Sequence, residues 1–220
     1  MATRPRETFH REMEQLLDQI LMLGSMVEDA MLVSVSYLKK RDLAGSKRLI
    51  ERDQQINAKR FEIEDRALTL IALHQPVARD LRMLGAVLEV ATELERIGDY
   101  AKGISHINVL IGDAPLLKPL IDVPLMCEKA MSMLRQGLDA FVNRDVDAAR
   151  AIPAQDDEVD QLYHQVYREL VSYILEDPSC IEQANYLLWA AHNLERAADR
   201  VSNICERTVF TATGEMSELD

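Results

Sequence analysis

Two short stretches of this sequence place acidic residues at a spacing that suits metal binding. Glu95 precedes Asp99 by four positions, and 100 residues later Glu195 precedes Asp199 in the same way. On a helix this spacing puts both carboxylates on one face, with Cβ atoms about 5–6 Å apart. Carboxylates that close repel each other unless a cation lies between them. The duplicated pair therefore indicates cation binding at two places in the chain.

A second polar pair precedes each acid pair and completes a candidate ligand set. Asp53 and Asn57 lie before the first acid pair, and Asp156 and Asp160 lie before the second. If the helices that carry these pairs are neighbours, oxygen-bearing side chains converge in each half, as hard cations and carboxylate-bound iron or manganese require. Asn57 lacks the charge of Asp160, so we expect the first site to bind cations less tightly. The predicted metal ligands are Asp53, Asn57, Glu95, Asp99, Asp156, Asp160, Glu195 and Asp199.

The alternative is that these acids belong to an ordinary solvated helix face. Arginines could then neutralise them as ion pairs, and the candidates are Arg60, Arg96, Arg196 and Arg200. Two observations favour metal binding. The acids continue apolar rows such as Leu84, Leu88 and Ala91, and the pairs recur at matching places in both halves. His192, one turn before Glu195, is a candidate for a supporting contact to a ligand.

The sequence contains no recognisable catalytic motif. Glycine-rich nucleotide-binding motifs, the GxSxG nucleophile motif and the HExxH zinc motif are all absent. A ferritin-like di-iron bundle needs a glutamate three residues before a histidine on two helices, and only Glu7 and His10 have this spacing. We therefore expect a protein that is not an enzyme. The alternative is a metal-dependent phosphohydrolase that uses the same carboxylates, since paired metal ions can drive phosphoryl chemistry.

Composition and charge narrow the class of protein. Hydrophobic residues make up 48% of the 220 residues, and only 8 Gly and 7 Pro occur, which favours a helical chain with a substantial core. The net charge of −12 argues against nucleic acid as a partner, because phosphate backbones require clustered Lys and Arg. Three cysteines without a CxxC pair favour a reducing compartment, and we expect a cytoplasmic protein. Residues 1–7 contain no apolar segment typical of a signal peptide, and no uninterrupted apolar run of 18 residues predicts a membrane span.

Apolar residues at spacings of three and four predict six long helices, three in each half. Gly112 and the prolines that follow it separate the halves, so we expect two repeats at residues 1–112 and 113–220. Short polar turns between long helices predict an all-α fold of two tandem antiparallel three-helix bundles, produced by internal duplication. The predicted helices span about 6–40, 43–73, 77–109, 125–143, 146–177 and 179–210.

Four segments carry a resemblance to a known family. They are Gln75–Arg82, Glu93–Asp99, Asp156–Asp160 and Asn193–Arg200. Together they resemble the PhoU family of bacterial phosphate-uptake regulators, and the similarity extends from about residue 9 to residue 210. One departure is Ala-Ala at positions 197 and 198, where the family often has Ile-Gly. This change alters packing beside the second acid pair but leaves both acids in place.

The resemblance implies two three-helix bundles that assemble as a homodimer. It also implies multinuclear metal clusters on the ligand positions given above, with iron, zinc, manganese or magnesium as the metal. Members of the family damp high-affinity phosphate uptake and keep the phosphate-starvation (Pho regulon) response silent when phosphate is plentiful. The implied partners are the ATPase subunit of the phosphate ABC transporter and the phosphate-sensing histidine kinase. We therefore expect a negative regulator that acts as a metal-binding adaptor.

Overall fold

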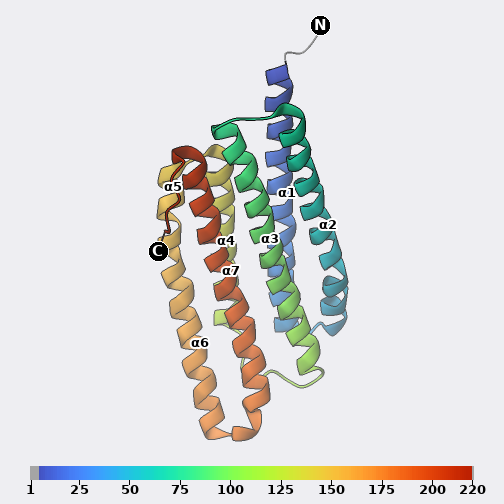
Figure 1. Ribbon diagram of the computed structural model, residues 1–220. Coiled ribbons are helices and arrows are strands. Elements are labelled where there is room, and N and C mark those ends of the chain that lie inside the picture. The colour runs from blue at the N-terminus through green and yellow to red at the C-terminus, as the bar shows by residue number, and fades with distance from the viewer. Residues whose placement is uncertain (1–4, 220) are drawn as a thin grey trace.

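The computed structural model describes residues 5–219 and consists of long helices joined by short turns (Figure 1). No strand occurs within this range, so the predicted all-α class is confirmed. The N-terminal residues 1–4, which contribute to the expectation of no signal peptide, lie outside the described residues. The helices are α1 (Pro5–Lys40), α2 (Leu43–His74), α3 (Arg79–Ile111), α4 (Asp122–Asn143), α5 (Val146–Ala151), α6 (Asp156–Glu176) and α7 (Ile181–Thr213), with short 3₁₀ turns η1 (Pro153–Gln155) and η2 (Pro178–Cys180).

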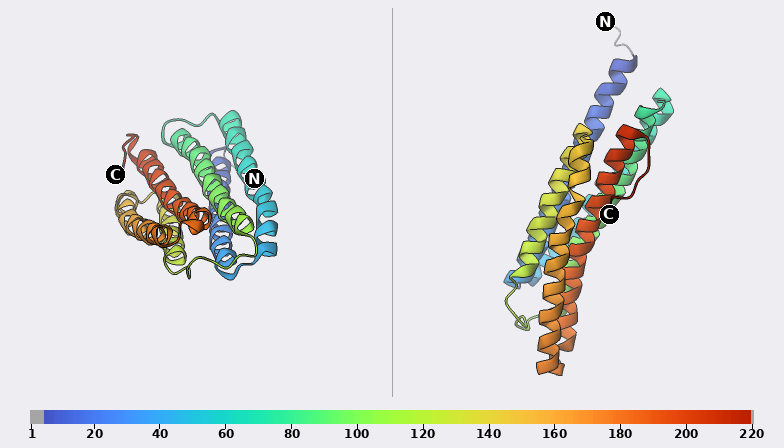
Figure 2. Two further views of the ribbon diagram at one scale, coloured as in Figure 1. Left: turned by 90° about the horizontal axis from the view of Figure 1, so that it is seen from below. Right: turned by 90° about the vertical axis from the view of Figure 1, so that its left-hand side faces the viewer.

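The helices form two three-helix bundles that lie side by side along their lengths. The first bundle consists of α1, α2 and α3, and the second consists of α4, α6 and α7, with the short α5 packed against α4 and α7. The end-on view in Figure 2 shows α3 and α7 next to each other in the middle, with α2 and α6 on opposite outer sides. Helix α1 also packs against α4. The predicted tandem bundles are therefore confirmed. The helices that carry the duplicated acid pairs, α3 with Glu95 and Asp99 and α7 with Glu195 and Asp199, are neighbours.

Helix α3 is central because it packs against α1, α2 and α7. Its sequence meets this demand with two adjacent apolar stripes, whereas a helix packed on one side needs only one. Leu88 of the second stripe is partly buried, and the other side chains are fully buried, namely Met83, Leu84, Val87, Val90, Ala91, Leu94, Ile97, Ala101 and Ile104. One continuous core runs through both bundles. The division into residues 1–112 and 113–220 stays a prediction, because this shared core joins the two repeats.

The predicted fifth helix is wrong in one respect. We expected it to run without interruption over 146–177, but the structure divides this segment into α5, η1 and α6. Pro153 explains the interruption, since proline lacks an N–H and its ring clashes with the preceding turn of an α-helix. It lies at the first turn of η1, where neither defect matters. As a consequence Asp156 is the first residue of α6, whereas its counterpart Asp53 lies inside α2.

The sequence was not expected to contain a membrane span, but helix α1 is apolar enough to meet the criterion for one. It contains an 18-residue window with a mean hydropathy of 1.4, which is long and apolar enough to cross a membrane by length and composition alone. The core helix of a bundle meets the same criterion. In α1 the side chains of Leu16, Ile20 and Leu23 are fully buried against the other helices, so their apolar character is explained by packing.

Asn108 on α3 stabilises the turn between α1 and α2 through hydrogen bonds. Arg41 adopts a left-handed conformation with φ of 58°, and Asp42 caps α2 by accepting a hydrogen bond of 2.7 Å from the Gly45 amide. The side chain of Asn108 is fully buried, and its Nδ2 lies 2.8 Å from Ser46 Oγ and 3.2 Å from the carbonyl oxygen of Asp42. Its Oδ1 accepts a hydrogen bond from Arg41. Asn108 thus fixes where α2 starts relative to α3.

Replacing Asn108 by Ala should destabilise the protein by about 2–3 kcal/mol, because buried backbone and side-chain polar groups lose their partner. The free energy of unfolding from urea denaturation measures this effect. The control is Gln54→Ala on the exposed face of α2, which should change stability by less than about 0.5 kcal/mol. Equal stability of the two variants would show that the Asn108 contacts contribute nothing.

Candidate metal centre

The acids of the first repeat meet at the interface between α2 and α3, where a lysine joins them. Asp53 is only 5% exposed, and its Oδ2 lies 2.8 Å from Lys102 Nζ. The same ammonium group lies 3.6 Å from Asp99 Oδ1. Asn57 Nδ2 donates a further hydrogen bond of 3.1 Å to Asp53 Oδ2. Burial, and then the charge of Asp99, raise the pKa of Glu95. The structure therefore brings the predicted first set together around Lys102.

The acids of the second repeat meet between α6 and α7 without a lysine. Burial first, and then the neighbouring carboxylates, raise the pKa of Asp156 to about 7. Burial and the charge of Asp199 also raise the pKa values of Asp160 and Glu195. Asp199 thus acts on all three of the other carboxylates. These groups destabilise one another's charged forms, which is the situation that a bound cation relieves.

Two oxygen atoms of the second set are buried without a hydrogen-bond partner, namely Asp156 Oδ1 and Glu195 Oε2. His192 Nδ1 lies 3.0 Å from Glu195 Oε2, but the two groups are not aligned for a hydrogen bond. Buried polar atoms are nearly always satisfied, and carboxylate oxygens are the ligands that hard cations take. The donor set of the second repeat therefore fits a metal ion.

The acidic side chains of the second repeat have the right chemistry for a metal ion, but they must move to surround one. Within residues 5–219, no three carboxylate, imidazole or thiol groups converge closely enough to form a ready-made metal cage. Asp156 and Asp199 line a cavity of about 710 Å³ between α5, α6 and α7, which leaves room for their side chains to turn and for an ion to enter. Metal ligation by any of the eight predicted residues stays a prediction.

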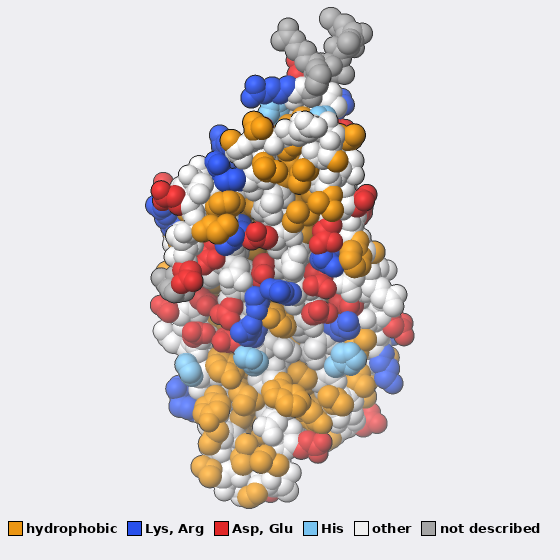
Figure 3. All heavy atoms as spheres, viewed as in Figure 1, with side chains coloured by type: hydrophobic (Ala, Val, Ile, Leu, Met, Phe, Trp, Pro, Cys, Tyr) orange, Lys and Arg blue, Asp and Glu red, His pale blue; other side chains and the backbone are white. Residues whose placement is uncertain are grey.

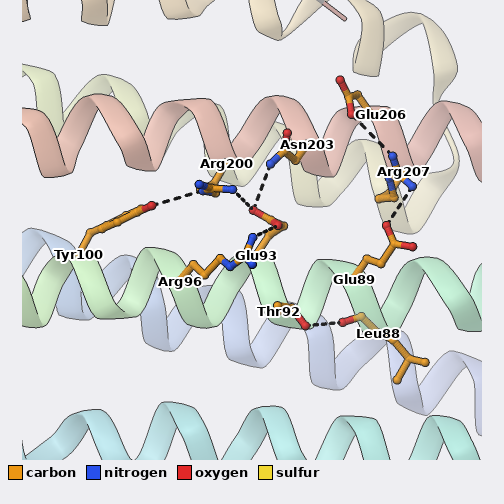
Figure 4. Close-up of polar contacts among 10 residues, drawn as sticks. All are labelled: Leu88, Glu89, Thr92, Glu93, Arg96, Tyr100, Arg200, Asn203, Glu206 and Arg207. Carbon is orange, nitrogen blue, oxygen red and sulfur yellow. Dashed lines mark hydrogen bonds and ion pairs between the residues drawn. The ribbon is translucent and has the colours of Figure 1, made fainter. Parts of the chain in front are cut away.

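The arginines that could have neutralised the acids are directed mainly at other partners. Arg60 pairs with Glu64 on its own helix. Arg96 Nη1 donates a hydrogen bond of 2.9 Å to Glu93, and Arg200 Nη1 lies 3.4 Å from the same carboxylate (Figure 4). The contacts of Arg200 and Asn203 with Glu93 join α7 to α3, whereas that of Arg96 lies within α3.

The ion-pair alternative therefore describes the first acid set better than the second. Arg196 stays near Asp199, with 3.9 Å between the charged atoms, on an exposed part of α7. Pairs this long and this solvated contribute little to stability. In the first repeat, by contrast, Lys102 does pair with two of the acids. In the second repeat the ion pairs to the acids are Arg196–Asp199 and His192–Glu195, both within α7, and neither joins α6 to α7.

Sequence reasoning missed two kinds of residue at these sites. Lys102 lies three positions after Asp99 on one helix, and this spacing was a usable signal for an ion pair. His164 acts on Asp160 and favours its charged form, as His192 does for Glu195. His192 was expected to support the site, whereas His164 was not among the predicted residues. His164 lies four positions after Asp160 on the same helix, so this spacing was also a usable signal.

Asp156→Asn should make the metal-free protein progressively more stable than wild type as the pH rises from about 4 to about 7. The folded protein holds the proton of Asp156 up to about pH 7, whereas the unfolded chain loses it near pH ~3.9. The stabilising protonated form is therefore fully present below about pH 4 and is lost as the pH passes the folded pKa. We expect a gain of about 1–2 kcal/mol at pH 8, reduced because solvent screens this half-buried group. Urea unfolding in EDTA measures it, and Asp18→Asn on the exposed face of α1 is the control; a pH-independent difference would contradict the expectation.

Comparison with known proteins agrees with this architecture. The family model for the PhoU domain matches residues 20–107 and 123–208. A relative from Aquifex aeolicus, named phosphate-specific transport system accessory protein PhoU homolog, is 34% identical over 206 residues, covering 94% of this chain and 93% of the relative. The accessory protein PhoU of Escherichia coli is 32% identical over 207 residues, covering 94% of this chain and 86% of the relative.

Solved structures are similar over the same length. The phosphate transport system regulatory protein PhoU from Streptococcus pneumoniae gives a TM-score of 0.88 at 29% identity, covering 96% of this chain and 100% of that one. PhoU from Pseudomonas aeruginosa gives a TM-score of 0.87 at 30% identity, covering 94% of this chain and 100% of that one. Because the family model matches both repeats and the relatives match almost end to end, the chain belongs to the PhoU family.

Proposed function

We propose that this protein is a negative regulator of high-affinity phosphate uptake and of the phosphate-starvation response. In this proposal it is a cytoplasmic homodimer that acts as an adaptor between the ATPase subunit of the phosphate ABC transporter and the phosphate-sensing histidine kinase. The observation that carries the proposal is the match of both repeats to relatives named as accessory proteins of the phosphate-specific transport system. The absence of catalytic sequence motifs supports an adaptor over an enzyme.

Metal binding in the second repeat is part of the same proposal. The ligands would be Asp156 and Asp160 from α6 together with Glu195 and Asp199 from α7. A bound iron, zinc, manganese or magnesium ion would supply positive charge between these carboxylates. The mutual repulsion of the acids would then become attraction to a shared cation, which ties α6 to α7. A metal that binds only the folded state also stabilises it by mass action.

An exposed apolar end of the molecule supports the docking role. Leu175 at the end of α6 is 79% exposed, and Ile181 and Trp189 at the start of α7 are 52% and 55% exposed. Figure 3 shows hydrophobic side chains gathered over this lower end, below the belt of acidic residues. Contiguous exposed apolar surface marks sites of protein association. We assign this end, formed by the α6–α7 turn, to the ATPase subunit.

A metal-dependent phosphohydrolase is the second candidate function. The observation in its favour is the cavity of about 710 Å³ beside Asp156 and Asp199, which is large enough to admit a substrate. Such an enzyme needs an open metal coordination position and a general base. Release of phosphate from a broad set of esters by the manganese-, zinc- or iron-loaded protein would favour it. Lack of turnover, together with tight binding of the ATPase subunit, favours the adaptor.

Removing metal should weaken binding to the ATPase subunit by at least about fivefold, a size typical of coupling between two sites. Calorimetric titration of the purified ATPase subunit with manganese-loaded and EDTA-treated protein measures the difference. Circular dichroism confirms that the treated protein keeps its helices. Unchanged affinity after complete metal removal would limit the metal to a structural role, and no binding in either state would reject the adaptor proposal.

Trp189→Ala should weaken the same complex by about 30-fold, since a central aromatic residue commonly contributes about 2 kcal/mol to an interface. Leu73→Ala is the matched control, because Leu73 is 73% exposed at the end of α2, far from the α6–α7 turn (Figure 1). We expect the control to bind like wild type. If Leu73→Ala weakens the complex and Trp189→Ala does not, the opposite end of the molecule is the docking surface.

A further inference from the structure

Lys102 contacts two of the predicted metal ligands of the first repeat. Its ammonium group lies 2.8 Å from Asp53 on α2 and 3.6 Å from Asp99 on α3, so it bridges carboxylates from two helices. The side chain of Asp53 is only 4% exposed, and its Oδ2 also accepts a hydrogen bond from Asn57. This oxygen therefore has two donors already, and one of them carries a positive charge that repels cations.

The second repeat differs at both of the positions that satisfy Asp53. Alignment of Leu94–Asp99 with Leu194–Asp199 places Ser202 at the position of Lys102, and Asp160 replaces Asn57. In the first repeat three acids and one lysine give a charge of −2, whereas four acids in the second give −4. Asp156, the counterpart of Asp53, keeps a buried carboxylate oxygen without a hydrogen-bond partner, whereas in the first repeat the oxygen in this state is the neutral amide Oδ1 of Asn57. Both changes increase the attraction of the second repeat for a cation.

We propose that Lys102 is a built-in cation that excludes divalent metal from the first repeat, so that only the second repeat binds metal. The inference rests on the metal binding in the proposed function and goes beyond the lower affinity expected from Asn57. Its consequence is a division of roles between the repeats. A permanent ion pair joins α2 to α3, whereas the joining of α6 to α7 depends on metal. A change in metal supply would then alter one half of the adaptor and leave the other half unchanged.

Exchange of the differing residues between the repeats tests this proposal, with Mn²⁺ as the probe. Lys102→Ser with Asn57→Asp gives the first repeat the residues of the second, and Ser202→Lys gives the second repeat a lysine. Metal per chain is measured by elemental analysis after dialysis, and affinity by calorimetry. Ser202→Met is the size-matched neutral control for the lysine, and circular dichroism shows which variants keep the fold.

We expect the double variant to bind about twice as much Mn²⁺ as wild type. Ser202→Lys should lower the affinity of the second repeat by at least about tenfold, because the new ammonium group repels the ion. Ser202→Met should bind like wild type. In the wild-type background, Asp199→Ala should abolish Mn²⁺ binding and Asp99→Ala should leave it unchanged.

Equal loss of metal in Asp99→Ala and Asp199→Ala would overturn the proposal, since both repeats would then hold metal despite Lys102. Binding by the double variant but not by wild type would support the role of Lys102 and reject metal binding in the proposed function. If no variant binds Mn²⁺, both the role of Lys102 and the metal centre are rejected.

Discussion

Carboxylates held between two packed helices repel each other, and both bundles of this protein are built around that constraint. Burial, and then the charges of neighbouring acids, raise the pKa values of Glu95, Asp156 and Glu195. The first bundle meets the constraint with the ammonium group of Lys102. The second has no lysine there and keeps buried carboxylate oxygens without partners. The same duplicated motif thus produces one interface with a lysine between its acids and one without it.

The two interfaces are connected because α3 and α7, which carry the acid pairs, pack against each other. Gly103 permits their close approach, since a Cβ atom at this position would lie 2.9 Å from Asn193 Nδ2 on α7. Glu93 then joins the helices through Arg200 and Asn203 (Figure 4). A ligand that shifted α7 would therefore also shift the groups of α3 that contact it. This arrangement is suited to a regulator, in which an event at one site alters a surface elsewhere.

The helices were predictable because apolar spacing directly reflects the face that each helix buries. The stripes assigned to the third predicted helix are the buried face of α3, and the predicted helix ends lie close to those in the structure. The break at Pro153 was missed because a strong apolar pattern continues on both sides of it. The acid sets were predictable as groups because they repeat at matching positions in both halves. Their neighbours Lys102 and His164 were signalled only by spacing on one helix, to Asp99 and Asp160, whereas the contact of Lys102 with Asp53 crosses between helices and required the structure.

The sequence by itself determined the family, the helical class, the duplication and the positions of the eight polar residues. These properties depend on residue type and spacing along one chain, which the sequence displays directly. The tertiary structure alone decided what each acid contacts: Asp53 meets an ammonium group, whereas Asp156 meets other carboxylates. The physical reason is that electrostatic energy depends on distance and burial between helices, and packing sets both of these quantities. Two nearly identical motifs therefore differ in their demand for a cation.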